Sequence, residues 1–318
     1  MNGIARSACV GVFFVFGLSP ASAQTQQART FVSSFGNDAN DCGRFTPCRT
    51  FQRAHDQTLS LGEITVLDPG GYGAVTITKG ISIINDGVGE AGALISGGFT
   101  GITISAPATE AVSLRGLTVK GIGFGGGNGI VFNSGKSLAI ENCAIRNLDG
   151  NGVGNGIVFI PNGGTSKLAV SNTVIAENST AGMIVRPTGS VAVKVALNRV
   201  EIYNNAGFGI FLLGNNATGL IDVTAVDSVV ANNDDSGFRA DSNSAETRVM
   251  VSRSAVINNS TGLDPRGPQV TMRVGQTQVT GNGIGWNLML GATVLSYGDN
   301  SIDGNITDGG LAPLINKR

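Results

Sequence analysis

Four ionisable residues in the last third of the chain have types and spacing that could do chemistry. Arg239 and Asp241 are two residues apart, and Asp264 and Arg266 repeat that spacing 25 residues later. Side chains two residues apart in a strand point to the same side of a sheet. Arginine can bind an acidic sugar chain or abstract a proton from it, and aspartate can bind calcium or donate a proton. This ionic cluster is therefore our candidate catalytic site.

The ionic cluster also has a purely structural interpretation. If the two segments form adjacent strands, Arg239 lies beside Asp264 and Asp241 lies beside Arg266. That arrangement predicts two cross-strand ion pairs on a solvated sheet, each contributing at most about 1 kcal/mol to stability. The sequence alone leaves both interpretations open.

Other residues whose side chains should point to the same side of the sheet as the ionic cluster enlarge the candidate surface. Arg186 lies two repeat units before the ionic cluster and Asn287 lies one unit after it, so both join the candidate binding residues. Phe211 and Leu213 join them from an apolar strip, which we interpret as an interface or a platform. The members of this apolar strip are Val131, Val158, Ile160, Ile184, Phe211 and Leu213.

A repeated sequence motif determines which residues share a face. Each copy contains a polar turn, a glycine, a large apolar residue and a short strand. The intervals between these glycines are 27, 26, 27, 28, 25 and 23 residues. A period in the twenties indicates a solenoid, in which each unit buries its apolar face against its neighbours. The glycines are Gly129, Gly156, Gly182, Gly209, Gly237, Gly262 and Gly285.

The segments between these glycines contain further strands instead of helices. They are rich in Val, Ile and Thr and mostly alternate in polarity, as in residues 168–175. Because the turns are too short for crossover helices, we expect each unit to form one coil of a parallel β-helix, with coils about 4.8 Å apart. The predicted inward column is Ile130, Ile157, Met183, Ile210, Phe238, Leu263 and Trp286. The predicted amide ladder is Asn178, Asn204, Asn233, Asn259, Asn282 and Asn305.

Composition limits the alternatives. The 318 residues include 48 glycines, and 41% of them are hydrophobic and 14% charged, which suits a turn-rich β solenoid. The formal net charge of −1 provides no basic stripe, so nucleic-acid binding is disfavoured. The single histidine, His55, leaves no Cys/His metal cluster and no histidine-dependent triad away from its own surroundings.

The N-terminus has the pattern of a secretory signal peptide. Arg6 precedes an apolar stretch that is too short to span a bilayer, and an Ala-Ser-Ala sequence ends at Ala23. We expect cleavage there and no membrane span in the mature protein. The predicted boundaries are a signal peptide at 1–23, a cap at 24–62, the β-helix at 63–303 and a tail at 304–318.

The predicted cap would cover the open end of the solenoid. Residues 49–61 have the apolar spacing of a short helix ending at Gly62. In an exported protein the nearby Cys42 and Cys48 are expected to form a disulfide. Cys143 lies in a predicted strand of the repeat, and we expect it to be a small buried residue with a free thiol.

The segment from Arg29 to Tyr72 carries a family resemblance. It reads Arg29-Thr-Phe-Val-Ser, Gly36-Asn-Asp-Ala-Asn-Asp-Cys, Pro47-Cys-Arg-Thr-Phe and Gly62-Glu-Ile-Thr-Val-Leu-Asp-Pro-Gly-Gly-Tyr. With the later Asn and Gly-Ile phrases, it resembles exported bacterial right-handed parallel β-helix proteins of the pectin-lyase-like superfamily, over nearly all of the mature chain. The resemblance implies an all-β fold and a carbohydrate ligand, because pectate lyases, polygalacturonases, epimerases, tailspikes and adhesins share it.

The resemblance also separates two kinds of chemistry. Polygalacturonases use clustered aspartates and a nearby histidine, but here His55 belongs to the cap, so that hydrolysis is disfavoured. Pectate lyases use an arginine or lysine base with calcium bound by aspartates. If the chain is lyase-like, Asp241 and Asp264 are its weak calcium candidates, and no other cofactor is expected.

These observations predict a secreted protein, extracellular or periplasmic, that binds a polysaccharide or cell-surface glycan without catalysis. One alternative is a polysaccharide lyase or epimerase acting on an acidic chain through the ionic cluster. Another is a structural surface protein that self-associates through the apolar strip.

Overall fold

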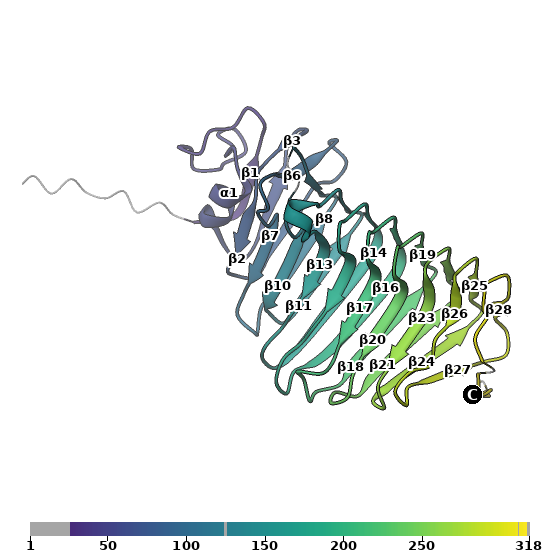
Figure 1. The fold of residues 1–318 in the computed structure, drawn as a ribbon. Coiled ribbons are helices and arrows are strands. Elements are labelled where there is room, and N and C mark those ends of the chain that lie inside the picture. Colours follow the sequence, from purple (N-terminus) through teal and green to yellow (C-terminus); the bar gives the residue numbers. More distant parts are fainter. Residues whose placement is uncertain (1–25, 124–125, 311, 317–318) are drawn as a thin grey trace, which may run out of the picture.

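A computed structural model describes residues 26–123, 126–310 and 312–316. The predicted signal peptide, residues 1–23, lies outside the described residues. The chain winds into a rod of stacked coils that runs from the N-terminal helix α1 (Phe51–Gln57) to the C-terminal strands (Figure 1). The predicted all-β parallel β-helix with a short helical cap is confirmed.

Each coil contributes one strand to a parallel sheet, which we call sheet B and which has nine strands in the described residues. These strands contain the residues that follow the repeated glycines, and they pair in register, so that Met183 lies beside Ile210. The strands are β4 (Val75–Ile77), β7 (Ile102–Ser105), β10 (Ile130–Ser134), β13 (Asn155–Phe159), β15 (Ala181–Val185), β17 (Phe208–Leu213), β20 (Ser236–Asp241), β23 (Thr261–Arg266) and β26 (Ile284–Trp286).

The rest of each coil belongs to a second parallel sheet, sheet A, whose strands form two columns. The first column begins with β1 (Gln27–Val32) and continues with β2 (Thr58–Val66), β5 (Ile81–Ile84), β8 (Ala111–Arg115), β11 (Ser137–Glu141), β14 (Thr165–Ala176), β16 (Ala192–Tyr203), β18 (Ile221–Val226), β21 (Thr247–Ser252), β24 (Val270–Gly275) and β27 (Thr293–Ser296). The second contains β3 (Gly70–Gly71), β6 (Ala91–Ile95), β9 (Thr118–Gly121), β12 (Ala144–Arg146), β19 (Val229–Ala231), β22 (Ala255–Ile257), β25 (Gln278–Thr280) and β28 (Ser301–Ile302). The longer strands β14 and β16 pair in both columns.

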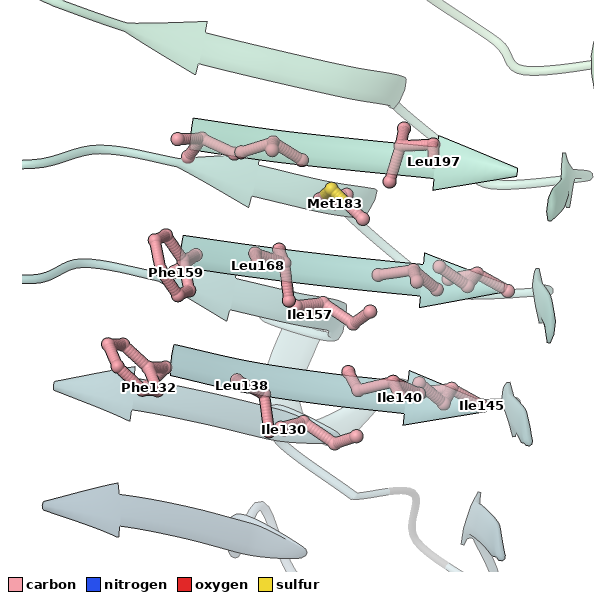
Figure 2. Packing of buried hydrophobic residues seen from close by; sticks show 14 of the residues in the cluster. Ile130, Phe132, Leu138, Ile140, Ile145, Ile157, Phe159, Leu168, Met183 and Leu197 are labelled. Atoms are coloured by element: carbon pink, nitrogen blue, oxygen red, sulfur yellow. The ribbon is translucent and has the colours of Figure 1, made fainter. Parts of the chain in front are cut away.

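The apolar core fills the space between sheets A and B. Figure 2 shows Ile130, Ile157 and Met183 one above another from sheet B, facing Leu138 and Leu168 from sheet A. All seven residues of the predicted inward column are buried, as expected. Like residues also stack along the rod, and the centroids of the Phe132 and Phe159 rings lie 4.5 Å apart.

The repeated glycines are required by close packing. At Gly182, a Cβ atom would lie 2.4 Å from Ile202 Cγ2, 2.8 Å from the Gly209 carbonyl oxygen and 3.1 Å from Asn205 Nδ2. The neighbouring coils repeat this arrangement, so a larger residue would push the coils apart. None of these glycines has a positive φ, so glycine is needed here for lack of space and not for its backbone conformation.

The predicted amide ladder exists, with one member corrected. Asn178 Nδ2 donates to Asn205 Oδ1 at 2.9 Å, and Asn205 Nδ2 donates to Asn233 Oδ1 at 2.8 Å. Asn259, Asn282 and Asn305 continue the series. The prediction of Asn204 was wrong, because that residue has a φ of 54° and forms the left-handed turn immediately before the ladder.

A second series of side chains, which we did not predict, supports the turn between the two columns of sheet A. The hydroxyl of Ser228 accepts from the backbone N–H of Val200 at 3.1 Å, and Ser254 does the same for Ser228. Thr277 Oγ1 continues the series by accepting from the backbone N–H of Ser254 at 3.4 Å. Both turns therefore satisfy buried backbone donors with stacked side chains.

The cap is shorter in helix than predicted. Helix α1 ends at Gln57, and residues 58–62 already belong to β2, which crosses the predicted boundary at 62. Thr50 begins the helix because its hydroxyl accepts from Arg53 N at 3.2 Å. Within the described residues, no helix is long and apolar enough to cross a membrane.

The three described cysteines have the predicted states. Cys42 and Cys48 form a disulfide in the cap. Cys143 is a free thiol that is only 4% exposed, and burial raises its pKa to about 11. The tail packs on the last coils through short bridges from Ile284 to Thr307 and from Ser296 to Leu314.

Candidate functional site

The structure brings the predicted site residues onto one surface, which we call the sheet B face. Phe211, Arg239 and Asp264 are in register on β17, β20 and β23. Leu213 and Asp241 are likewise in register on β17 and β20. Arg266 on β23 is in register with Asp241 on β20. The glycine spacing therefore predicted the neighbours correctly.

The two shortest ion pairs run along the strands, and a longer one runs across them. Arg239 Nη2 lies 2.9 Å from Asp241 Oδ2, and Arg266 Nη2 lies 2.8 Å from Asp264 Oδ2. Across the strands, Arg239 Nη1 is 3.9 Å from Asp264 Oδ2. The predicted Arg239–Asp264 pair is therefore present as the longer contact of Arg239, whereas Arg266 pairs with Asp264 instead of the predicted Asp241. An arginine is long enough to reach the carboxylate two residues away on its own strand. Nε and Nη2 of each guanidinium both donate to that carboxylate.

Asp264 is covered, although it points away from the core. Its side chain is 1% exposed, because Arg266, Ser236 and Asn287 surround it. Ser236 Oγ donates to Asp264 Oδ2 at 3.1 Å, and Asn287 Nδ2 approaches Oδ1 at 3.4 Å. The hydrogen bond to Asp264 raises the pKa of Arg266, so this guanidinium remains protonated. The expectation of a solvated ion-pair face is therefore incorrect at Asp264.

Aromatic rings hold Arg239 from the other side. Its guanidinium carbon lies 5.2 Å from the ring centroid of Phe208 and 5.6 Å from that of Phe211. Phe211 is therefore support for Arg239, and its ring is only partly accessible. Phe208 was not among our candidates because it precedes Gly209, outside the alternation that we used to select outward residues.

A groove of about 480 Å³ lies beside the ionic cluster. We call it the Arg186 groove. Arg186 is exposed, and among the described residues no carboxylate lies within ion-pair distance of it. Leu213 belongs both to this groove and to the strip next to Asp241. The lining residues are Asn133, Ile160, Asn162, Arg186, Thr188, Leu213 and Asn216.

The polar residues of the groove come from the ends of sheet B strands and the turns that follow. Asn133 lies in β10, whereas Asn162, Thr188 and Asn216 lie just after β13, β15 and β17. Our strand-based selection of candidates ended too early to include the three turn residues. Their recurrence after successive strands is the signal that could have identified them.

A family model described as "Right handed beta helix region" matches residues 100–284, which is more than half of the chain. The chain belongs to this family. The match confirms the right-handed β-helix that the resemblance implied. No curated protein is detectably similar to this β-helix protein in sequence.

Solved structures with similar folds are distant in sequence. The pectate lyase Pel9A is 15% identical, with 92% of this chain and 78% of that chain covered and a TM-score of 0.51. The A-module of mannuronan C-5 epimerase AlgE4 from Azotobacter vinelandii is 14% identical, with coverages of 81% and 91% and a TM-score of 0.44. The GH136 lacto-N-biosidase from Eubacterium ramulus is 12% identical, with coverages of 91% and 67% and a TM-score of 0.48.

The weak calcium candidates of this β-helix protein, Asp241 and Asp264, each bind an arginine. Within the described residues, no three His, Cys, Asp or Glu side chains are grouped closely enough to hold a metal ion. As folded, the ionic cluster presents two neutralised pairs, whereas the Arg186 groove presents an unneutralised cation among amides and a hydroxyl.

Proposed function

We propose that this protein binds a glycan, or another surface polymer, along the sheet B face without cleaving it. The observation that carries the proposal is the Arg186 groove. Its three asparagines and one threonine offer both donors and acceptors, which match sugar hydroxyls, and Ile160 and Leu213 add apolar contact. Arg186 adds a cation that can bind an acidic substituent.

The ionic cluster supports binding over catalysis. A base must release its proton before it can abstract one, but Arg239 and Arg266 each donate two hydrogen bonds to a carboxylate. The raised pKa of Arg266 makes that release harder. In our proposal the cluster is a rigid, neutral border of the groove.

We also propose that the protein acts outside the cytoplasm, either in the periplasm or beyond the cell. The Cys42–Cys48 disulfide supports this location, because disulfides persist in oxidising compartments. The signal-peptide pattern at residues 1–23 points the same way.

The proposal is tested by binding of the mature protein to neutral and acidic polysaccharides, for example with a glycan array followed by calorimetry. Arg186→Ala should weaken binding of an acidic hit about tenfold, equivalent to ~1.4 kcal/mol. Arg248→Ala is the matched control, because Arg248 is exposed on sheet A and pairs with Glu246. Equal affinity of the parent and Arg186→Ala, or an equal loss in both variants, would contradict the proposed face.

A polysaccharide lyase or epimerase is the second candidate function, favoured by the shared fold with a pectate lyase. The same binding samples distinguish it. A lyase would release unsaturated uronate ends that absorb ultraviolet light, and calcium would be required. Product formation from pectate or alginate that disappears in Arg266→Ala would replace the binding proposal with this one.

A further inference from the structure

The outer surface of sheet A, remote in the coil from the sheet B face, carries three lysines at the first column of its strands. Lys167 in β14 is in register with Lys194 in β16. The backbone N–H of Lys167 donates to the carbonyl of Lys136 at 3.2 Å, so Lys136 lies on the coil before, immediately preceding Ser137, which is in register with Lys167. We call these three exposed residues the lysine ladder. The six lysines of the chain are Lys79, Lys120, Lys136, Lys167, Lys194 and Lys317.

In the described part of the chain, the lysine ladder has no close ion-pair partner. Among the described residues, no carboxylate lies within ion-pair distance of any of the three. Glu110, whose carbonyl accepts from Lys136 N, directs its carboxylate to Ser60 Oγ, at 2.9 Å, and to a backbone N–H. Like charges directly opposite each other destabilise a sheet. Lys167 and Lys194 therefore repel each other across the sheet, and Asp222, in register with Lys194 on the other side, offsets only part of that repulsion.

A groove of about 440 Å³ runs beside the ladder, over β11, β14, β16 and β18. Ala139, Ala169 and Ala196 are in register along it. Their methyl groups leave an open channel where larger side chains would fill the surface. Lys167 and Lys194 line it, and Asp222, in register with Lys194, is its single carboxylate. The lining therefore carries two cations against one anion, and Lys136 precedes the lining residue Ser137 in the chain.

We propose that this lysine groove binds a linear glycan that carries sulfate or phosphate groups. An ammonium group is a compact point charge with three donors, which suits a tetrahedral oxyanion. Neighbouring strands are about 4.8 Å apart, so two adjacent lysines can bind one such group or successive groups on a chain. The described lining contains no arginine fork to select carboxylates and no aromatic ring on which a nucleic-acid base could stack.

Dextran sulfate and dextran phosphate, with unmodified dextran as the neutral backbone, test this site in the mature protein. Lys167→Gln/Lys194→Gln should bind the charged dextrans at least about tenfold more weakly than the parent. Sulfate and phosphate are distinguished by which dextran the parent binds more tightly. Added salt should weaken the parental binding, and less so in the variant, because fewer counterions are displaced.

The matched control is Lys120→Gln/Arg146→Gln. These two cations are also in register, on β9 and β12, but they do not line the groove. Binding unchanged in Lys167→Gln/Lys194→Gln, or an equal loss in the control, would overturn the proposal. So would binding of single-stranded DNA as tight as that of the charged dextrans, because the site would then not select a glycan.

This inference does not depend on the sheet B face. Arg186→Ala should leave dextran sulfate binding unchanged, and Lys167→Gln/Lys194→Gln should leave binding at the Arg186 groove unchanged. Each proposal can therefore fail while the other stands. The lysines are exposed, and unaltered melting of the variants would show that a loss of binding is not a loss of fold.

Discussion

The partners of an arginine decide what it can do on this surface. Arg239 lies over two phenylalanine rings and donates to Asp241, so its charge is neutralised and its position is held. Arg186, two coils away, is exposed and has no carboxylate within ion-pair distance in the described part of the chain. The first supports the surface, and the second is free to bind a ligand.

His55 is the residue whose protonation state bears most directly on the cap. It is buried, its Nδ1 lies 3.0 Å from Asp56 Oδ1, and its Nε2 accepts from Thr78 N at 3.2 Å. A proton on Nε2 would face the Thr78 N–H, so the folded cap favours the neutral ring. Burial accordingly lowers the pKa of His55, with Lys79 adding to the effect and Asp56 opposing it.

We expect the free energy of unfolding to fall as the pH falls below 6.5, the ordinary pKa of histidine. The unfolded chain binds a proton there that the folded chain resists, so the unfolded state gains stability. Denaturant unfolding between about pH 7 and about pH 5 measures the slope, and His55→Gln should flatten it. Aspartates with a lowered pKa, such as Asp68, affect the free energy of unfolding only at more acidic pH. An identical slope in the parent and the variant would exclude His55 as the cause.

At the scale of the element, the turn before sheet B depends on two consecutive asparagines with different roles. Asn204 adopts the left-handed conformation, and Gly281 occupies the corresponding place before Asn282. Asn205 is buried and bonds through its side chain to the coils on both sides. Glycine can therefore replace the first asparagine but not the second.

Asn205→Ala should lower the free energy of unfolding by about 3 kcal/mol, because it removes the Oδ1 acceptor of two buried donors, the backbone N–H and the side-chain Nδ2 of Asn178. Asn233 Oδ1 would keep its hydrogen bond from the backbone N–H of residue 205. Asn204→Gly, the matched control, should change it by less than about 0.5 kcal/mol, since φ is already 54° there. Chemical denaturation of both variants provides the comparison. Similar losses in the two would mean that the ladder contributes no more than the turn.

Sequence patterning predicted the elements that depend on period and missed those that depend on side-chain reach. The inward column followed from the glycine spacing, because parallel coils must stack like on like. The spacing could not decide whether Asn204 or Asn205 belongs to the amide ladder, since both positions carry the same residue type. The true end of α1 at Gln57 was also missed, because the apolar residues Leu59 and Leu61 fit a helix although they lie in β2.

The candidate site shows the same division. The spacing predicted that Arg239 would lie beside Asp264, and the register confirms it. It did not predict that Arg266 would pair with Asp264 on its own strand, because that depends on the arginine rotamer. The burial of Asp264 depends on Ser236 and Asn287, which belong to other coils, and no local pattern reports such cover.

At the scale of the whole molecule, the rod is held together by contacts between adjacent coils. Ile210 is fully buried between Met183 and Phe238 in the middle of the stack. In a solenoid each coil stabilises its two neighbours, so damage in the centre separates the structure into two shorter stacks. An end coil, with one neighbour, cannot have this effect.

Ile210→Asp should therefore lower the free energy of unfolding by more than about 4 kcal/mol, because it buries an unpaired charge. Ile184→Asp, on the outward side of the adjacent strand β15, is the control and should cost less than about 1 kcal/mol, since Ile184 is only partly buried. Hydrogen exchange locates the damage: protection should be lost first in β15, β17 and β20 and persist longest near the cap. Equal melting of Ile210→Asp and the parent would show that this position does not face the core, whereas uniform loss of protection along the rod would show that its coils unfold as one unit.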